Sequence, residues 1–419
     1  MGPELIFAVV VAGIIGAMIG TFTGLVPGIH VNTAATLLLG AYPAFEQLAE
    51  SLSGPGSAPI IVACCITSAS VVHSFVDFVP SVFIGVPDAD ETLSVLPGHR
   101  LFQEGRGMVA VRSAAIGSVV GSISAIALAI PLQWALMCGG TGIVDDLTLC
   151  VLLVVIGTII LTSEDPLISG MLLALSGVLG IVVQTGIVPV FSFLGDGTML
   201  FPLLTGLFGL PPLLERSSRR RPVRQRDPMR DPVGPMPGLK GVATGIVAGW
   251  FPGVTSTAGA LMASRITRET DPARFISMTA SIGTVTSVFS LVTLSVSGSG
   301  RSGTSMAVKS IVGDSLFGFC SDAFLLLLFC MALASVLGYG ATIVSGRFMM
   351  GVSERVPEKL MNDSILVLIV ALVTLFTGPF GLCLLVVSAA MGMIPPHMGV
   401  SRVCLTGCLT VPVLFGLFL

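Results

Sequence analysis

The chain has 419 residues, of which 53% are hydrophobic and only 10% are charged, and its formal net charge is −3. Soluble domains carry about 25% charged residues, so this composition excludes a water-soluble globular domain. The net charge itself says nothing about partners, because its distribution matters more than its sum, and we expect no nucleic-acid partner. The apolar runs are about 20 residues long and lack the alternation of membrane β-strands. We therefore predict an all-α polytopic protein of the cell membrane, surrounded by membrane lipid.

The first half of the chain, residues 1–214, begins with an apolar run at residues 5–26 that ends at Pro27-Gly28. No basic residue precedes this run and no small-residue cleavage site follows it, so we expect a retained membrane segment. A polar loop lies at residues 88–112. Further apolar runs in this half lie at residues 29–44, 59–86, 113–137, 147–161, 166–183 and 199–214.

Residues 215–237 contain no apolar run, and Pro recurs every few residues. They carry seven Arg: Arg216, Arg219, Arg220, Arg221, Arg224, Arg226 and Arg230. Such a composition is typical of an exposed linker. A second membrane repeat follows at residues 238–419, with apolar runs at residues 239–251, 254–263, 275–296, 306–319, 323–344, 365–376, 381–394 and 403–419. We expect about twelve membrane segments in all.

One pattern occurs twice, at residues 13–33 and 238–258. At an offset of 225 positions (252 − 27), the residues Gly13, Gly16, Gly20, Gly24, Pro27 and Gly28 coincide with Gly238, Gly241, Gly245, Gly249, Pro252 and Gly253. This coincidence predicts that the chain is a duplication. The spacing of the glycines along each helix indicates close helix packing.

The positions of Lys and Arg predict the orientation, because such residues gather in cytoplasmic loops. Neither residue type occurs before Arg100 or between Arg112 and Arg216. We therefore expect an external N-terminus and a cytoplasmic linker at residues 215–237, so the two copies form inverted repeats as in secondary transporters. If the loop around Arg265 and Arg268 is also cytoplasmic, the second copy is a re-entrant hairpin. Otherwise its Pro-Gly element is a broken span.

The Pro-Gly breaks carry the chemistry. Proline removes a backbone donor and glycine permits a sharp bend, so backbone groups at the break need other partners. A helix that resumes after the break directs amides and a positive dipole end at an anion. The predicted substrate- and ion-binding residues are Pro27, Gly28, His30, Asn32 and Thr33 in the first copy, and Pro252, Gly253, Thr255, Ser256 and Thr257 in the second. The alternative is that the breaks only kink two packed helices.

Other polar residues interrupt apolar runs. His73 and Asp77 are four residues apart and share one helix face, which suits either a proton-coupling pair or a structural hydrogen bond. Ser297, Ser299 and Arg301 lie in a Gly-Ser-rich loop that we expect to contact the substrate. Arg301 is placed to meet a carboxylate, although a plain cytoplasmic loop would also carry an Arg.

The two G-x3-G-x2-P-G breaks, the loop PGHRLFQEGRG at residues 97–107 and the SGSGR stretch at residues 297–301 resemble the large membrane subunit of the tripartite tricarboxylate transporters. The resemblance spans both repeats. It implies about twelve helices and transport of citrate-like carboxylates with the energy of an ion gradient. It also implies two partners, a small membrane subunit and an extracytoplasmic binding protein.

We therefore predict a permease for tricarboxylate- or dicarboxylate-like anions, driven by a Na⁺ or proton gradient. The alternatives are an ion or solute channel, because broken helices also line pores, and an assembly protein that moves no solute. We expect no enzyme, since no protease motif such as G-x-S-x-G or H-E-x-x-H occurs. No cofactor or metal is expected beyond Na⁺. We interpret the nine Cys as small buried hydrophobic residues.

Overall fold

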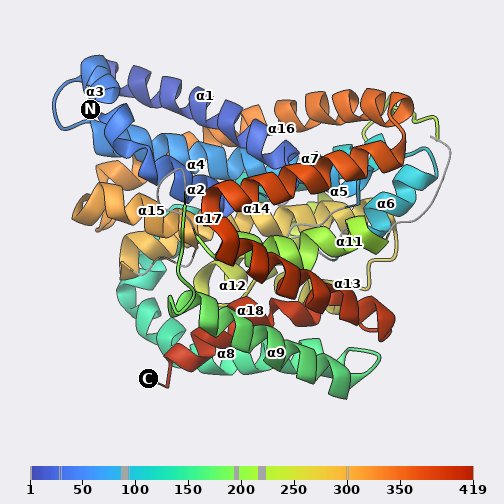
Figure 1. Cartoon of the computed structure of the whole chain (residues 1–419). Helices are drawn as coiled ribbons and strands as arrows, with labels where there is room; N and C mark the ends of the chain where they lie inside the picture. The colour runs from blue at the N-terminus through green and yellow to red at the C-terminus, as the bar shows by residue number, and fades with distance from the viewer. Residues whose placement is uncertain are drawn as a thin grey trace.

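The computed structural model describes residues 2–27, 29, 31–85, 93, 95–192, 198–215, 223–298, 300 and 302–418. All regular secondary structure within these ranges is helical, which confirms the all-α prediction (Figure 1). Seven helices in the described residues are long and apolar enough to cross a membrane, and two shorter apolar helices span Leu200–Glu215 and Arg402–Gly416. The protein is therefore polytopic, and the count of twelve segments stays a prediction.

The helices of the first half are α1 (Pro3–Leu25), α2 (Val31–Gly40), α3 (Tyr42–Ser53), α4 (Ala58–Val76), α5 (Phe78–Phe83), α6 (Val95–Gln103), α7 (Gly107–Ala135), α8 (Thr141–Leu161), α9 (Pro166–Gln184), α10 (Leu200–Leu204) and α11 (Leu210–Glu215). Two π-helical turns, Leu136–Gly140 and Thr205–Gly209, join α7 to α8 and α10 to α11.

The helices of the second half are α12 (Met236–Trp250), α13 (Ser256–Thr267), α14 (Pro272–Ser297), α15 (Gly303–Val312), α16 (Asp322–Arg355), α17 (Glu358–His397) and α18 (Gly407–Gly416). Two 3₁₀ turns, Gly313–Leu316 and Arg402–Thr406, follow α15 and precede α18. Helix α17 bends at Gly378, whose φ of 65° lies outside the helical region.

The glycines of α1 pack this helix directly against α4. A Cβ atom added at Gly16 would lie 2.2 Å from the carbonyl oxygen of Cys65, and one added at Gly20 would lie 2.4 Å from that of Ala69. Only glycine fits at so close an approach between two backbones. The contacts advance in the same direction along both helices, so α1 and α4 run parallel. The interpretation of the glycines as packing residues is confirmed.

The same packing recurs in the second half. A Cβ atom at Gly241 would lie 2.5 Å from the carbonyl oxygen of Met278, and one at Gly245 would lie 3.1 Å from that of Ile282. Ala69 and Ile282 face equivalent glycines and are 213 positions apart (282 − 69). Helices α12 and α14 therefore repeat the pair formed by α1 and α4.

The repetition extends to the far end of each half. Helix α9 packs on α18, and α17 packs on the turn Thr205–Gly209. A Cβ atom at Gly180 would lie 2.0 Å from the carbonyl oxygen of Cys408, and one at Gly392 would lie 2.4 Å from that of Leu207. The duplicated packing thus reaches well beyond the sequence pattern at residues 13–33 and 238–258.

One long helix of each half packs against helices of the other half. Helix α7 of the first half packs along α14 and α12, whereas α16 of the second half packs along α4 and α1 (Figure 1). At the first contact, a Cβ atom at Gly117 would fall 1.9 Å from the carbonyl oxygen of Ser277. At the second, a Cβ atom at Gly338 would lie 2.9 Å from the ring of Phe75. Each half therefore completes the packing of the other.

The second Pro-Gly element is the tip of a helical hairpin. Gly259 of α13 lies beside Thr244 and Ala248 of α12, and further along Lys240 Nζ donates to Glu269 Oε2 at 2.7 Å. The two helices are therefore antiparallel and their outer ends meet. This geometry favours the hairpin over a broken span for the second copy.

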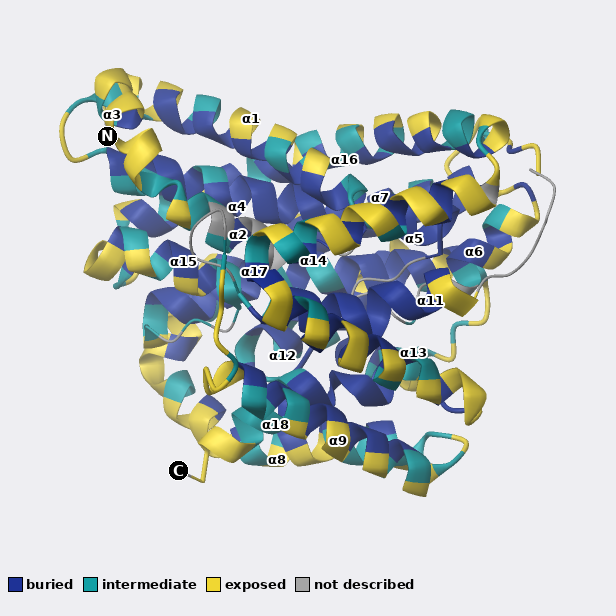
Figure 2. Cartoon of the chain, viewed as in Figure 1, coloured by how far each residue is buried: buried dark blue, intermediate teal, exposed yellow. Residues whose placement is uncertain are grey.

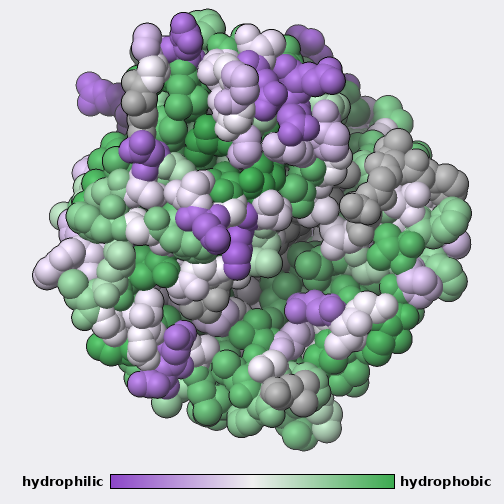
Figure 3. All heavy atoms as spheres, turned by 90° about the vertical axis from the view of Figure 1, so that its left-hand side faces the viewer, coloured by the Kyte–Doolittle hydropathy of each residue, from purple (hydrophilic) through white to green (hydrophobic). Residues whose placement is uncertain are grey.

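The outer faces of the bundle are apolar. Large hydrophobic side chains stand exposed there, for example Phe22 at 68%, Leu161 at 77% and Val336 at 72%, while the interior is buried (Figure 2). Figure 3 views one end of the molecule, where hydrophilic side chains gather in patches with apolar side chains between them. Exposed apolar flanks with polar ends are what a bilayer requires of a multi-pass protein.

The linker is not exposed throughout. Gln225 is only 6% exposed, and its Oε1 accepts from the Gly107 amide at 3.0 Å while its Nε2 donates to Phe102 O at 3.0 Å. The backbone amide of Gln225 donates to Glu354 Oε1 at 2.8 Å. The expectation of an exposed linker is therefore wrong at Gln225, because this side chain satisfies backbone groups at the α6–α7 turn.

A carboxylate fixes the linker to both halves. Asp227 accepts from Arg112 Nε of α7 at 2.8 Å and from Arg347 Nε of α16 at 2.9 Å. These two guanidinium groups hold the pKa of Asp227 below its ordinary value of 3.8, with the hydrogen bond from Arg112 the largest cause.

Candidate functional site

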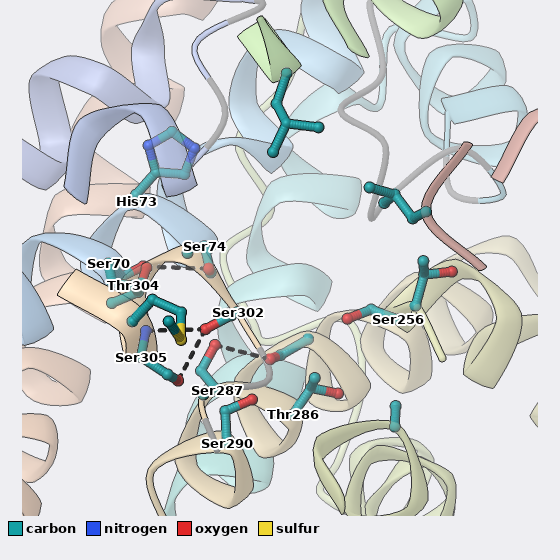
Figure 4. A pocket seen from close by; sticks show the side chains of 18 of the residues that line it. Ser70, His73, Ser74, Ser256, Thr286, Ser287, Ser290, Ser302, Thr304 and Ser305 are labelled. Atoms are coloured by element: carbon teal, nitrogen blue, oxygen red, sulfur yellow. Dashed lines mark hydrogen bonds between the residues drawn. The ribbon is translucent and has the colours of Figure 1, made fainter. Parts of the chain in front are cut away.

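A cavity of about 600 Å³ lies between the two repeated units. Its walls come from α4 and the start of α5, from α14, and from the N-terminal ends of α13 and α15. The ends of α9 and α10 and the helix α18 close it. The size lies within the usual range for small-molecule sites. Hydroxyl groups dominate the polar part of the lining, as the close view in Figure 4 illustrates.

Two walls of the cavity are equivalent. Five lining residues of α4 and α5 each have a counterpart 213 positions later on α14. This is the same offset that relates Ala69 of α4 to Ile282 of α14. The lining residues Ser70, His73, Ser74, Asp77 and Phe78 correspond in this way to Gly283, Thr286, Ser287, Ser290 and Leu291. The cavity therefore lies between the same faces of the two repeated units.

The N-terminus of α13 forms one part of the lining. Thr255 caps this helix, since its Oγ1 accepts from the Ala258 amide at 3.1 Å. Gly253 turns the chain before the cap with a φ of 77°, which an L side chain rarely adopts, and its carbonyl accepts from Thr410 Oγ1 at 2.9 Å. Ser256, the first helical residue, also lines the cavity.

The N-terminus of α15 forms another part of the lining. Ser302 caps this helix, with its Oγ 3.1 Å from the Ser305 amide and 2.9 Å from the Ser305 hydroxyl. Thr304 in the first turn pairs with Ser70 of α4 at 3.3 Å (Figure 4). The first turn of a helix leaves amides without intrahelical partners and carries the positive end of the dipole.

The arrangement suits an anion. Two helix N-termini of ten or more residues reach the same cavity, and each contributes about 0.3–1 kcal/mol toward an anion, rising to about 2 kcal/mol when partly buried. The hydroxyl of Thr67, which lines the cavity and is 3% exposed, has no hydrogen-bond partner among the described residues. A buried hydroxyl without a partner favours a polar ligand.

Within the described ranges, His73 and Asp77 are the ionisable side chains of the lining. His73 is 1% exposed, and its Nδ1 lies 3.0 Å from Thr23 Oγ1 of α1. The glycine-packed contact of α1 with α4 brings these two residues together. The histidine is thus fixed on one side by α1 and faces the cavity on the other.

The model of the tripartite tricarboxylate transporter TctA family matches residues 10–407. The chain belongs to this family. It is 29% identical over 302 residues to the uncharacterized protein MJ1079 of Methanocaldococcus jannaschii, an alignment that covers 71% of each chain. No solved structure matches. The TctA family is a family of transport proteins and not of enzymes, and its tripartite systems include a small membrane subunit and a periplasmic binding protein.

The sequence placed several residues of this TctA-family protein in a binding site, and the structure locates some of them. Gly253, Thr255, Ser256, His73 and Asp77 line the cavity.

Thr257 is fully buried and is not part of the lining, and neither Pro252 nor the buried Pro27 belongs to it. Ser297 lines a separate small pocket with Thr293 and Trp250. Four predicted site residues lie outside the described residues: Gly28, His30, Ser299 and Arg301. Asn32 and Thr33 lie in α2, and their side chains are outside the description as well.

The sequence reasoning named Thr304 as a residue that could line the cavity, but it missed Ser302 at the N-terminus of α15 and the α14 wall. Ser302 is a polar residue directly before a helix, which is the ordinary signal of an N-cap and could have been recognised. Thr286, Ser287 and Ser290 carry no such signal, because hydroxyl residues inside an apolar run usually bond to their own helix. Only the packing of α14 against α12 shows which face they present.

Proposed function

We propose that this TctA-family chain is the permease of its system, a secondary active transporter for tricarboxylate- or dicarboxylate-like anions. The observation that carries the proposal is the cavity between equivalent walls, which receives two helix N-termini. A multiply charged anion enters the membrane interior only where its charge is compensated. Helix N-termini supply positive potential there without a fixed cation.

The two repeats allow the binding site to open to each side of the membrane in turn. Residues 1–214 and 238–419 form inverted repeats joined by the linker at residues 215–237, with the N-terminus external and the linker cytoplasmic. Such repeats permit the site to open to either side in turn. A Na⁺ or proton gradient drives the movement. The small membrane subunit and the extracytoplasmic binding protein deliver the substrate.

The substrate carboxylates bind the first turns of α13 and α15. Ser256 and Thr255 support this from α13, and Ser302 and Thr304 from α15, since all four line the cavity. Gly28, His30, Asn32 and Thr33 supply the corresponding groups from the first Pro-Gly break, which the duplication relates to the second. Arg301 and Ser299 contact the substrate next to Gly300, which also lines the cavity.

Citrate binding to the purified protein tests the site without requiring partner subunits. We expect Ser256→Ala to weaken binding about tenfold, because a hydrogen bond to a charged group contributes about 1.5–3 kcal/mol. Ser51→Ala is the matched control, since Ser51 lies exposed on α3 and bonds to Leu48 O within its own helix. Equal affinities of both variants and the unchanged protein would place the site elsewhere.

Reconstitution in liposomes distinguishes the carrier from a channel. A carrier shows saturable citrate uptake that internal citrate accelerates. A channel passes the anion at a rate that internal citrate does not change. A protein with an assembly role alone shows no citrate movement in the presence of its partner subunits.

A further inference from the structure

The equivalent walls of the cavity differ in their ionisable groups. His73 and Asp77 on α4 are ionisable, whereas their counterparts on α14, Thr286 and Ser290, carry only hydroxyls. The flanking positions do not differ in this way, since Ser74 corresponds to Ser287. The duplication thus allows two equivalent walls of one cavity to be compared, of which the α4 wall has titratable groups and the α14 wall has hydroxyls at the same positions.

Among the described residues, the surroundings of the pair hold little other charge. Thr23 of α1 meets His73 Nδ1, the Cys330 thiol of α16 donates to Cys64 O of α4, and Gly338 of α16 lies against Phe75. Lys309 of α15 directs its Nζ to Gly298 O and is not part of the lining. Glu46 and Glu50 of α3 lie on a helix at the opposite end of α4. On α14 the lining is uncharged.

An anion and an ionised Asp77 cannot share this cavity without cost. Two like charges repel each other strongly where little water screens them. A proton held by Asp77 or by the His73 ring removes the repulsion, and a His73 imidazolium would attract the anion. The bound anion in turn favours the proton on the pair, because linkage is reciprocal.

We propose that His73 and Asp77 are the proton-coupling pair of this transporter, so that one proton enters the cavity with each anion. This proposal rests on the proposed carboxylate site and identifies the proton as its coupling ion. The proton comes from water on the side where the anion binds, resides on an Asp77 carboxylate oxygen or a His73 ring nitrogen, and leaves to water with the anion. No bond other than those to the proton forms or breaks.

Calorimetry of citrate binding to the purified protein tests the proposal in Na⁺-free solution. Titrations in buffers of different ionisation enthalpy count the protons that are taken up on binding. Protons taken up by citrate itself contribute equally in all variants and cancel when the variants are compared. We expect uptake of about one proton more in the unchanged protein than in Asp77→Asn, and an affinity that falls by up to about tenfold for each unit rise in pH. In Asp77→Asn this additional pH dependence is lost.

One further variant and a control sharpen the comparison. His73→Thr installs the residue of the equivalent wall, and Asp77→Asn keeps the shape of the side chain should that variant fail to fold. Ser51→Ala is the control, because Ser51 lies exposed on α3, outside the cavity, and its loss should keep the proton uptake.

The outcomes separate the two proposals. Citrate binding with equal proton uptake in the unchanged protein and in Asp77→Asn would refute the coupling pair and leave the carboxylate site standing. Binding that requires Na⁺ and takes up no extra proton would do the same. The absence of any citrate or succinate binding would overturn the carboxylate site and the coupling pair together.

Discussion

Gly20→Ala is the sharpest test of the packing that builds the site. The added Cβ would lie 2.4 Å from Ala69 O and 3.0 Å from the His73 amide nitrogen, both backbone atoms that cannot rotate away. Overpacking of this kind costs about 1–3 kcal/mol. Because the substitution pushes on the helix turn that carries His73, we expect lower thermal stability together with weaker citrate binding.

Gly157→Ala is the matched control. This residue lies within α8, and a Cβ atom there would meet nothing within 4 Å. Alanine in an open helix position gains about 0.5–1 kcal/mol over glycine, so the control should be neutral or more stable. Thermal unfolding of the purified protein in one detergent compares the variants. Equal unfolding temperatures for Gly20→Ala and Gly157→Ala would refute the close contact between α1 and α4.

Two further predictions concern the linker. Gln225→Ala should destabilise the protein by about 1–3 kcal/mol, because it leaves the buried Gly107 amide without its acceptor; Gln47→Ala on the exposed face of α3 is the control in the same unfolding assay. Asp227→Asn should remove a stabilisation that depends on pH. Since the pKa of Asp227 is lowered in the folded protein, this stabilisation is present above about pH 4 and is lost as the pH falls through the folded value. The unchanged protein should therefore lose more stability than Asp227→Asn between about pH 6 and 3. Parallel curves would contradict a stabilising role for the ion pairs of Asp227 with Arg112 and Arg347.

The sequence predicted the helical membrane fold from composition, because an apolar content of 53% with long uninterrupted runs leaves few alternatives. It also predicted that the second Pro-Gly break carries functional groups, and Gly253, Thr255 and Ser256 do line the cavity. Thr257 is fully buried and is not part of the lining, so its role in binding stays a prediction.

The linker shows why composition alone misplaces single residues. Arg and Pro are typical of exposed segments, and most of the described linker residues are indeed exposed or half-buried. Among the described linker residues Gln225 and Pro237 are buried, and Gln225 is buried because its side-chain amide matches the backbone donors and acceptors of the α6–α7 turn. Nothing in the local sequence indicates that match, since the partners lie more than one hundred positions away.

The extent of the duplication was hidden by a change in offset along the chain. The glycine-rich helices are 225 positions apart, whereas the helices they pack on are 213 apart, so the first half holds 12 more residues between them. Helix α3 has 12 residues, and the second half passes from α13 to α14 without an equivalent helix. A search at one offset therefore finds only the glycine-rich helix and its break. Contacts between helices do not depend on the length of the connection, so Ala69 and Ile282 take equivalent places, and the same comparison identifies Thr286 and Ser290 as the counterparts of His73 and Asp77.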